Sequence, residues 1–337
     1  MKDVAEAAGV AQSTVSRILN APLSIRVSEE TRQRVQAIAT ELGYHAHPFA
    51  TTLRGAPSML LGAVVRDITD PFFASAIEIL SIKARAQGYS VVLGHEAVAL
   101  TALVEARQCD AIVLLGDLHN APRLEEDLRK SHVHVVVLWH GAKQRGHGFP
   151  TVSVDNRAGI RAALRHLNSL GHRRIAFAGG DWNEDVRERR AVYVEYLQDA
   201  GIAIPDGYVR TLPTAMASGE LALEALEALL ALPQRPTAIL AATDTVAMGL
   251  IHSAHKLGVA IPEKLSIVGF DDIPIASVAV PGLTTVRMPL DKIMSAGVEL
   301  AIGDGAWADA AVWNPPRLVF KPKLIVRQST AAASDDS

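Results

Sequence analysis

Beyond residue 58, short apolar segments alternate with longer segments that carry apolar residues at helical spacing, and this alternation constrains the fold more than any other feature. The first set of apolar segments reads LLGAVV, YSVVLG, AIVLLG and VHVVVLW, and the second reads RIAFAGG, AILAATD and LSIVGF. Helical patterns such as PFFASAIEILSIKARAQG and SGELALEALEALLAL separate them. Strands that alternate with helices form parallel sheets with helices on both faces. The two sets therefore predict an α/β core of two lobes with parallel sheets.

The N-terminal segment KDVAEAAGVAQSTVSRILN predicts two short amphipathic helices joined by a glycine turn. The first helix ends at Gly9, and the second runs from about Gln12 to Leu19. The side chains expected to face inward are Val4, Ala5, Ala8, Val15 and Ile18. The outward arc of the second helix is polar and contains Gln12, Ser13, Ser16, Arg17 and Asn20.

A third helix is predicted within VSEETRQRVQAIATELGY, with Ser28 as its N-cap and Gly43 after its end. Its buried stripe is expected to contain Val35, Ile38 and Leu42. Three such helices, with a tight turn between the first two, are typical of a helix-turn-helix module. The pattern alone also fits a small helical cap with a solvated polar face. Charge does not decide, since residues 1–55 hold six Lys or Arg and five Asp or Glu, a net charge of +1.

Motifs along the rest of the chain favour the helix-turn-helix. They are DITDPFFA, VDNRAG, LGHRRIAFAGG, ATDTVAMG, IPEKLSIVGFDDIP, LTTVRMP and LIVRQST. Together with the N-terminal helices, they make the whole chain resemble the lactose-repressor (LacI/GalR) family of bacterial transcription factors. The resemblance implies an all-α helix-turn-helix domain over residues 1–44, a hinge over 45–57, and a periplasmic-binding-protein-like core over 58–330 for effector binding and dimerisation.

In this family the chain crosses between the two lobes three times. Here the crossings are expected near Val154, Thr285 and Asn314. The first lobe is then expected at about 58–154 and 286–313, and the second at about 155–285 and 314–328.

The resemblance also implies which residues contact operator DNA. Gln12 and Ser13 are expected to read base edges in the major groove, and Arg17 to contact a guanine or a nearby phosphate. Thr14, Ser16 and Asn20 lie on the same helix and complete the predicted DNA-binding set. Leu53 matches the hinge leucine that the family wedges between base pairs in the minor groove. The alternative for the hinge is a flexible tether in which Leu53 packs locally.

Loops that follow the predicted strands are expected to form an effector site, because ligands of open α/β sheets bind at the carboxyl ends of strands. Arg189 and Asp271 match the family's principal effector-binding arginine and aspartate. A guanidinium and a carboxylate suit a sugar, since one donates to oxygens and the other accepts from hydroxyls. Phe72 or Phe73 offers an apolar face. The alternative is a solvated Arg189 and a core role for one phenylalanine.

Two positions depart from the family's pattern at this site. Trp139 stands where members commonly have a hydroxyl-binding aspartate, and Thr243 where an asparagine is frequent. An indole in place of a carboxylate removes a polar anchor and adds a stacking surface. A typical hexose fit is therefore not assumed.

The sequence lacks the motifs that would indicate an enzyme, a nucleotide-binding protein, a metalloprotein or a membrane protein. The sequence has no GxSxG, no GxGxxG after a strand, no GxxxxGK and no HExxH. We therefore expect no catalytic residues, cofactor or metal; His45 with His47 lacks a third ligand, and His132 with His134 flanks a strand. Cys109 precedes an apolar segment and is expected to be a buried structural thiol. No apolar segment is long enough to cross a membrane, and no signal segment opens the chain, so a cytoplasmic location is expected.

These observations predict a sequence-specific DNA-binding transcriptional regulator, a repressor controlled by a small effector such as a sugar or sugar derivative. The net charge of −3 requires that DNA binding come from a local surface. The tail after Arg327 has no leucine heptads, so we expect a homodimer on a palindromic operator. Two alternatives remain. They are a periplasmic-type sugar-binding protein, for which a signal segment is missing, and an α/β enzyme.

Overall fold

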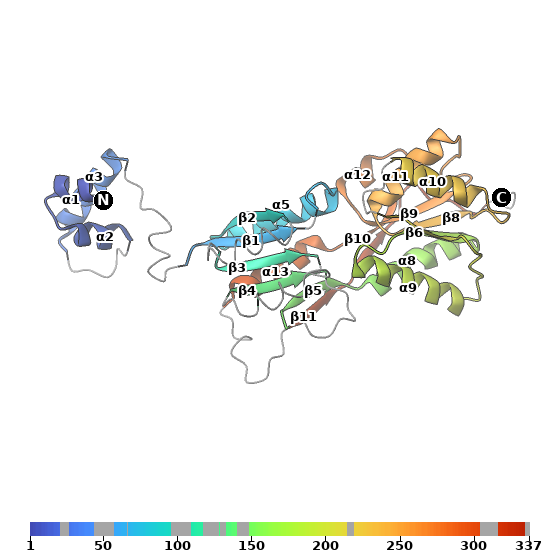
Figure 1. Ribbon diagram of the computed structural model, residues 1–337, viewed down its shortest axis with the longest axis horizontal. Helices are drawn as coiled ribbons and strands as arrows, with labels where there is room; N and C mark the ends of the chain where they lie inside the picture. Colours follow the sequence, from blue (N-terminus) through green and yellow to red (C-terminus); the bar gives the residue numbers. More distant parts are fainter. Residues whose placement is uncertain are drawn as a thin grey trace. The chain divides into compact units, whose positions relative to one another are not determined.

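The computed structural model describes residues 1–20, 27–43, 57–65, 67–95, 109–116, 128, 133–139, 148–213, 219–303 and 316–333 (Figure 1). Most of the expected hinge, including Leu53, lies outside these ranges, as do His45, His47 and His132. The chain divides into two compact units, Met1–Met59 and Leu60–Ser337, which are described separately below.

In the N-terminal unit, three helices pack around a small apolar core: α1 (Lys2–Ala8), α2 (Gln12–Asn20) and α3 (Glu29–Glu41). α1 ends where Gly9 adopts a left-handed conformation with φ of 64°, which glycine tolerates because it lacks a Cβ. The Ser28 hydroxyl caps the first turn of α3, as predicted. The core side chains are Val4, Ala5, Ala8, Val15, Ile18, Val35 and Ala39. The helix-turn-helix expectation is confirmed.

One residue of the expected stripe on α3 is not in this core. Val35 is buried and Ile38 is half-buried, but Leu42 is 52% exposed. Because α3 ends at Glu41, Leu42 is the C-cap residue and lies where the chain leaves the helix. Ala39, one turn after Val35, completes the buried stripe instead.

Lobe 1 of the second unit is a six-stranded sheet, in the order β11-β5-β4-β3-β1-β2, with every neighbouring pair parallel. Its strands are β1 (Leu60–Val65), β2 (Ser90–His95), β3 (Ala111–Leu115), β4 (His134–Leu138), β5 (Thr151–Val154) and β11 (Arg317–Phe320). Two helices that pack against each other cover one face, α5 (Pro71–Ala86) and α13 (Leu290–Ile302). Alternate strand residues point to the opposite face, where Cys109 and Leu128 join a second apolar cluster.

Lobe 2 is also a six-stranded sheet, in the order β12-β10-β9-β8-β6-β7. Its strands are β6 (Ile175–Gly179), β7 (Val209–Thr211), β8 (Ala238–Ala241), β9 (Ser266–Asp271), β10 (Thr284–Arg287) and β12 (Lys323–Ile325). Only β12 runs antiparallel to its neighbour in this sheet. The helices of this lobe are α8 (Asn156–Ser169), α9 (Glu184–Asp199), α10 (Gly219–Leu230), α11 (Asp244–Lys256) and the short α12 (Pro274–Val278).

The helices of lobe 2 cover both faces of its sheet. Figure 1 shows α8 and α9 on one side and α10 and α11 on the other. Helices on both faces explain why strands β6, β8 and β9 are buried along their whole length and read as continuous apolar segments. The predicted fold class, a helix-turn-helix domain with a two-lobed parallel α/β core, is confirmed.

The crossings between the lobes agree with the sequence expectation at two places and differ at the third. The chain leaves lobe 1 after Val154 and returns to it between Arg287 and Leu290. The third crossing lies between Phe320 and Lys323, so the expected position near Asn314 is wrong. β11 is a short edge strand whose side chains are mostly exposed, so its sequence lacks the apolar pattern of a buried strand. It belongs to lobe 1 because its backbone pairs with β5, and this pairing cannot be read from the residues of β11 alone.

Candidate functional site

The first candidate surface is the outward face of α2. Gln12, Ser13 and Arg17 are exposed, whereas Thr14 and Ser16 are half-buried. The α2 residues that the core requires, Val15 and Ile18, lie on the opposite side of the helix and are buried. The side chain of Asn20 lies outside the description. α2 therefore presents a polar face of the kind that enters a DNA groove.

The second candidate site is a cavity between the two lobes, with about 530 Å³ of space counting its open mouth. It is lined by Asp70, Phe72, Phe73, Gly116, Trp139, Trp182, Asn183, Asp185, Val186, Arg189, Thr243, Asp271 and Met288. The chain at or directly after the carboxyl ends of β1, β4, β6, β8 and β9 contributes at least one of these residues in each case. They meet because each follows the carboxyl end of a parallel strand. All six residues predicted to bind the effector thus lie around one cavity.

Arg189, on α9, is the buried cation of this cavity, with 4% of its surface exposed. Its Nη1 donates to the Ala242 carbonyl at 2.7 Å and to Asp271 Oδ1 at 3.4 Å. Its guanidinium also lies 3.7 Å from the centroid of the Phe270 ring, a cation–π contact. The reading of Arg189 as a solvated residue at a helix start is therefore wrong.

A buried amide connects Arg189 to a second carboxylate. Asn156, at the start of α8, accepts a hydrogen bond from Arg189 Nε at 2.9 Å. Its Nδ2 donates to Asp185 Oδ1 at 2.6 Å and to Glu188 Oε2 at 2.9 Å. The chain Asp271–Arg189–Asn156–Asp185 therefore orients two carboxylates and a guanidinium around the cavity.

Two buried carboxylates, Asp271 at the end of β9 and Asp244 at the start of α11, have raised pKa values. Burial raises the pKa of Asp271 well above its ordinary value, although the Arg189 guanidinium lowers it. Burial also raises the pKa of Asp244 to about 6. Asp244 does not line the cavity; it accepts hydrogen bonds from the Ile273 amide at 2.9 Å and from the Thr285 hydroxyl, and so holds the loop after β9.

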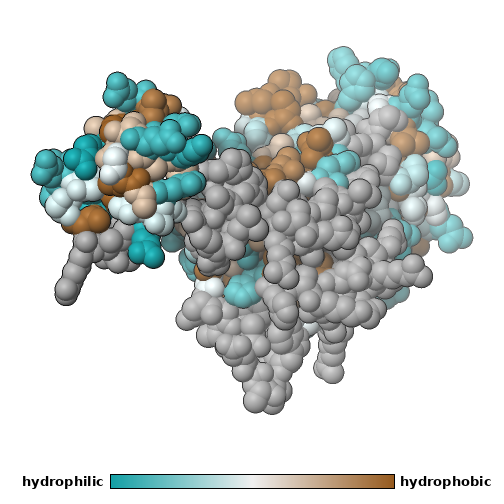
Figure 2. Space-filling view, turned by 60° about the vertical axis from the view of Figure 1, so that its left-hand side comes forward, coloured by the Kyte–Doolittle hydropathy of each residue, from teal (hydrophilic) through white to brown (hydrophobic). Residues whose placement is uncertain are grey.

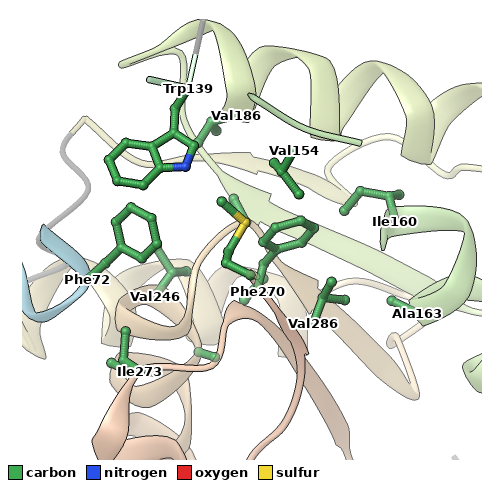
Figure 3. Close-up of a cluster of buried hydrophobic side chains, with 14 of the residues drawn as sticks. Phe72, Trp139, Val154, Ile160, Ala163, Val186, Val246, Phe270, Ile273 and Val286 are labelled. Carbon is green, nitrogen blue, oxygen red and sulfur yellow. The ribbon is translucent and has the colours of Figure 1, made fainter. Parts of the chain in front are cut away.

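Aromatic side chains form the wall of the cavity on the lobe 1 side. Phe72 and Phe73 open α5, whose N-cap Asp70 accepts the Phe72 amide at 3.0 Å. The ring centroids of Phe72 and Trp139 are 4.8 Å apart, and those of Phe73 and Trp139 are 5.8 Å apart. Figure 3 shows the Phe72 ring facing the indole of Trp139. Both phenylalanines are buried and both line the cavity. Each therefore packs in the apolar core of lobe 1 and also contributes to the cavity wall.

Trp139 has two unusual features. Its Nε1 is buried and has no hydrogen-bond partner among the residues that the structure describes. Its backbone has a φ of 57°, in the left-handed region that side chains larger than glycine rarely adopt. The Trp139 amide donates to the Val152 carbonyl at 2.9 Å, which ties this strained residue to the next strand.

Two polar residues of the cavity are already used as helix caps. Thr243 Oγ1 accepts the Val246 amide at the start of α11, and Asn183 Oδ1 accepts the Val186 amide at the start of α9. Their hydrogen-bonding capacity toward a ligand is reduced accordingly. Thr243 therefore lines the cavity while its hydroxyl caps α11.

Sequence reasoning missed several lining residues and the bridging Asn156. The missed lining residues are Asp70, Gly116, Trp182, Asn183, Asp185, Val186 and Met288. Four of them lie within GDWNEDVRER, the segment after β6 that also contains Arg189. Spacing offered one signal, since Asp185 precedes Arg189 by one helical turn and shares its face. Asn156 had no such signal, because it lies on a different helix.

Neither a metal centre nor a membrane-spanning helix is found in the part of the chain that the structure describes. Groups of three or more potential metal ligands were absent from those residues. Cys109 is buried, and burial raises its pKa to about 11, which leaves the thiol protonated and unreactive at neutral pH.

Comparison with known proteins places this geometry in a family. Residues 1–47 match the model of bacterial regulatory proteins of the lacI family, and residues 164–330 match a periplasmic binding protein-like domain. The chain is 33% identical to the HTH-type transcriptional regulator GalS of Salmonella typhimurium, over 98% of this chain and 96% of that protein.

Solved structures agree with this assignment. The lac repressor dimer bound to operator and the anti-inducer ONPF aligns with a TM-score of 0.81 and 25% identity over 98% of each chain. The transcriptional regulator CelR in complex with cellobiose aligns with a TM-score of 0.70 and 27% identity, over 97% of this chain and 98% of that one. The chain belongs to the lacI family of bacterial regulatory proteins and is a DNA-binding transcriptional regulator.

Proposed function

We propose that this regulator is a homodimeric repressor of a palindromic operator, and that a small polyhydroxylated molecule bound between the lobes changes its affinity for DNA. One observation carries the proposal: the buried Arg189–Asp271 pair borders a cavity that both lobes of a lacI-family chain line. Charged donors and acceptors in a water-poor site make strong hydrogen bonds to hydroxyl groups.

The link from cavity to DNA follows from the position of the cavity. A molecule that contacts both lobes binds one arrangement of the lobes better than others and shifts the population toward it. CelR bound to cellobiose and the lac repressor bound to ONPF show that similar chains hold small molecules of this kind. We infer a sugar or sugar derivative as the effector class here.

DNA contact is assigned to α2 and the hinge. Gln12 and Ser13 read base edges, Arg17 contacts a guanine or phosphate, and Leu53 wedges into the minor groove. The exposure of Gln12, Ser13 and Arg17 supports this assignment. Thr14, Ser16 and Asn20 complete the surface. Such a protein works where the bacterial chromosome is, in the cytoplasm, and its relatives are regulators rather than enzymes.

Exposed apolar side chains support dimerisation of the core. Figure 2 shows groups of hydrophobic residues among hydrophilic ones on its surface. Val278 and Val280, at and after the end of α12, are 70% and 93% exposed, and Ile82 on α5 is 59% exposed. Apolar side chains with this much exposure are candidates for an interface between two copies of the chain. β2, at one edge of the lobe 1 sheet, carries the exposed Leu93 as well.

The test is selection of operator DNA by the full-length protein. The purified chain is incubated with a library of random duplexes, and the enriched sites are titrated by gel shift against an unrelated duplex of equal length. The expected result is a palindromic site bound at least about a thousandfold more tightly than the unrelated duplex. Binding without sequence preference would contradict the repressor assignment.

Dimerisation is tested separately by sedimentation velocity. A variant with Val278→Asp and Val280→Asp is expected to shift the protein toward monomer and to weaken operator binding. Val319→Asp is the matched control, because Val319 is 55% exposed on β11, at the opposite edge of the lobe 1 sheet from β2. A double variant that remains as dimeric as the wild type would place the interface elsewhere.

A further inference from the structure

The second crossing between the lobes is attached to the end of β9. The Met288 amide, which lies in this crossing, donates to the Asp271 carbonyl at 3.3 Å. Arg287, the last residue of β10, pairs with the Asp272 carboxylate across 2.5 Å. Asp272 also accepts a hydrogen bond from Arg327 at 2.7 Å. Movement of this crossing therefore moves the residues at the end of β9, and the reverse.

The other two crossings reach β9 through the buried ring of Phe270. Gly159 lies in the first turn of α8, directly after the first crossing, and Pro322 lies in the third. A Cβ built on Gly159 would lie 2.8 Å from Phe270 Cε2 and 3.0 Å from Pro322 Cγ. These two crossings are also joined to each other, because the Asp155 amide donates to the Phe320 carbonyl at 2.9 Å. Only a residue without a Cβ allows Phe270 and Pro322 to pack this closely against α8.

Phe270 thus belongs to a dense part of the core where the two lobes meet. Figure 3 shows its ring in the buried cluster that also contains Val154 and Val286, near the ends of β5 and β10. The Arg189 guanidinium lies 3.7 Å from the centroid of the same ring. Protein interiors are close-packed and transmit strain, so a displaced ring displaces its neighbours. The ring of Phe270 therefore connects the buried cation of lobe 2 to the first and third crossings.

We propose that Gly159 and Phe270 are positioning residues: the packing between them sets the arrangement of the two lobes in the free protein, and thereby its affinity for operator DNA. A methyl group at residue 159 has no free space, so it pushes Phe270 and Pro322 away from α8 and favours a different arrangement. The inference rests on the proposed function, because it requires that the arrangement of the lobes controls operator binding.

The experiment compares operator binding by the full-length wild type and the Gly159→Ala variant. The operator is the duplex selected from the random library, the Kd is measured by gel shift, and stoichiometric titration with the same duplex gives the concentration of active protein. Gly159→Ala is expected to change the operator Kd by at least about fivefold, the lower end of common couplings between distant sites. Gly159 belongs to the second unit, whereas DNA contact is assigned to the first, so the change reports on the arrangement of the lobes.

Gly297→Ala is the matched control. Gly297 lies within α13, and a Cβ built on it would lie 3.1 Å from Leu138 Cδ2 in the core of lobe 1. Neither residue belongs to a crossing. Both variants replace a helical glycine and crowd a buried side chain, so a general disturbance of packing affects both. Gly297→Ala is expected to leave the operator Kd unchanged, and thermal unfolding establishes that each variant is folded.

A compensating substitution tests the contact itself. Phe270→Leu removes the ring atoms that a methyl group at residue 159 would meet. In the Gly159→Ala background it is expected to return the operator Kd toward that of the wild type, so that the two effects are not additive. If Gly159→Ala does not fold, Phe270→Leu alone tests the same packing, and it is likewise expected to change the operator Kd.

A folded Gly159→Ala variant with the operator Kd of the wild type would overturn the inference. Equal changes in Gly159→Ala and Gly297→Ala would do the same, as would additive effects of Gly159→Ala and Phe270→Leu. Absence of specific DNA binding in the wild type would overturn the proposed function and this inference with it. Specific binding by the wild type that Gly159→Ala leaves unaltered would overturn the inference alone.

Discussion

The guanidinium of Arg189 donates to the carboxylate of Asp271 across 3.4 Å, and both side chains are more than nine-tenths buried. The pair joins α9 to the end of β9 and borders the cavity between the lobes. An ion pair in such a place is costly to desolvate, and it gives little stability that an apolar pair would not give. We therefore propose that the pair is retained for recognition of hydroxyl groups on the effector.

Removal of either partner is expected to abolish the effector response while operator binding persists. Arg189→Ala and Asp271→Ala each lose hydrogen bonds to a charged group, contributions of about 1.5–3 kcal/mol each, or roughly ten- to a hundredfold in Kd. Because we assign DNA contact to the N-terminal helices and the hinge, the gel shift without effector should be unchanged. Calorimetry and gel shifts with effector measure the loss, with Arg190→Ala as the control. A variant that still responds with near-normal affinity would exclude this site.

Asn156→Ala is expected to weaken the effector about tenfold although Asn156 does not line the cavity. The substitution leaves Arg189 Nε and Asp185 Oδ1 without their bridging amide, so both cavity groups lose their orientation. The free energy of unfolding should fall by about 1–3 kcal/mol as well. The double variant with Arg189→Ala distinguishes a positioning role from a structural one. It should bind effector no worse than Arg189→Ala alone, and additive losses would argue against positioning.

Asp244→Asn is expected to remove the part of the pH dependence of folding stability that comes from protonation of Asp244. The pKa of Asp244 is 3.8 ordinarily and about 6 in the folded protein, so the folded state holds more protons between these values. The free energy of unfolding therefore falls as pH rises from about 4 to about 6, by about 3 kcal/mol. Asparagine retains an acceptor for the Ile273 amide and can donate to the Thr285 hydroxyl. Denaturant unfolding should show the variant gaining stability relative to wild type across this window. A constant difference from pH 4 to 7 would rule the titration out.

Substitution of Gln12 and Ser13 together is expected to change which operators are preferred. Base-edge hydrogen bonds distinguish base pairs by about 1–3 kcal/mol each, so the ranking of sites in a library should be rearranged. Arg17→Ala should instead weaken binding to all sites. Gln36→Ala serves as a control, since Gln36 is an exposed amide on α3. An unchanged ranking in the double variant would refute the assignment of α2 as the reading helix.

Leu53→Ala is expected to reduce affinity for the operator more than affinity for random DNA. A wedge in the minor groove is used only where the duplex is bent, which occurs in the specific complex. The operator Kd should rise about tenfold while the random-duplex Kd changes little, and Thr52→Ala should alter neither. Parallel losses on both duplexes would mean that Leu53 is an ordinary tether residue.

Local signals along the chain were sufficient for much of this architecture. Gly9 and Ser28 mark helix boundaries through the conformation of one residue or the hydrogen bond of one hydroxyl. The alternation of strands and helices predicts parallel sheets because only a crossover helix returns the chain in the same direction. The loops of the cavity were predictable for the same reason, since parallel strands bring their carboxyl ends to one edge.

Other features depend on contacts between residues far apart in the chain, which no local pattern encodes. The pairing of β11 with β5 sets the third crossing between the lobes, and Asn156 meets Arg189 only because α8 and α9 pack together. Arg189 is likewise buried because Asn156, Ala242 and Phe270, which are distant from it in the sequence, pack around its side chain in lobe 2. These features arise from hydrogen bonds and desolvation in three dimensions, whose energies depend on distance in space, whereas helix period and capping depend on distance along the chain.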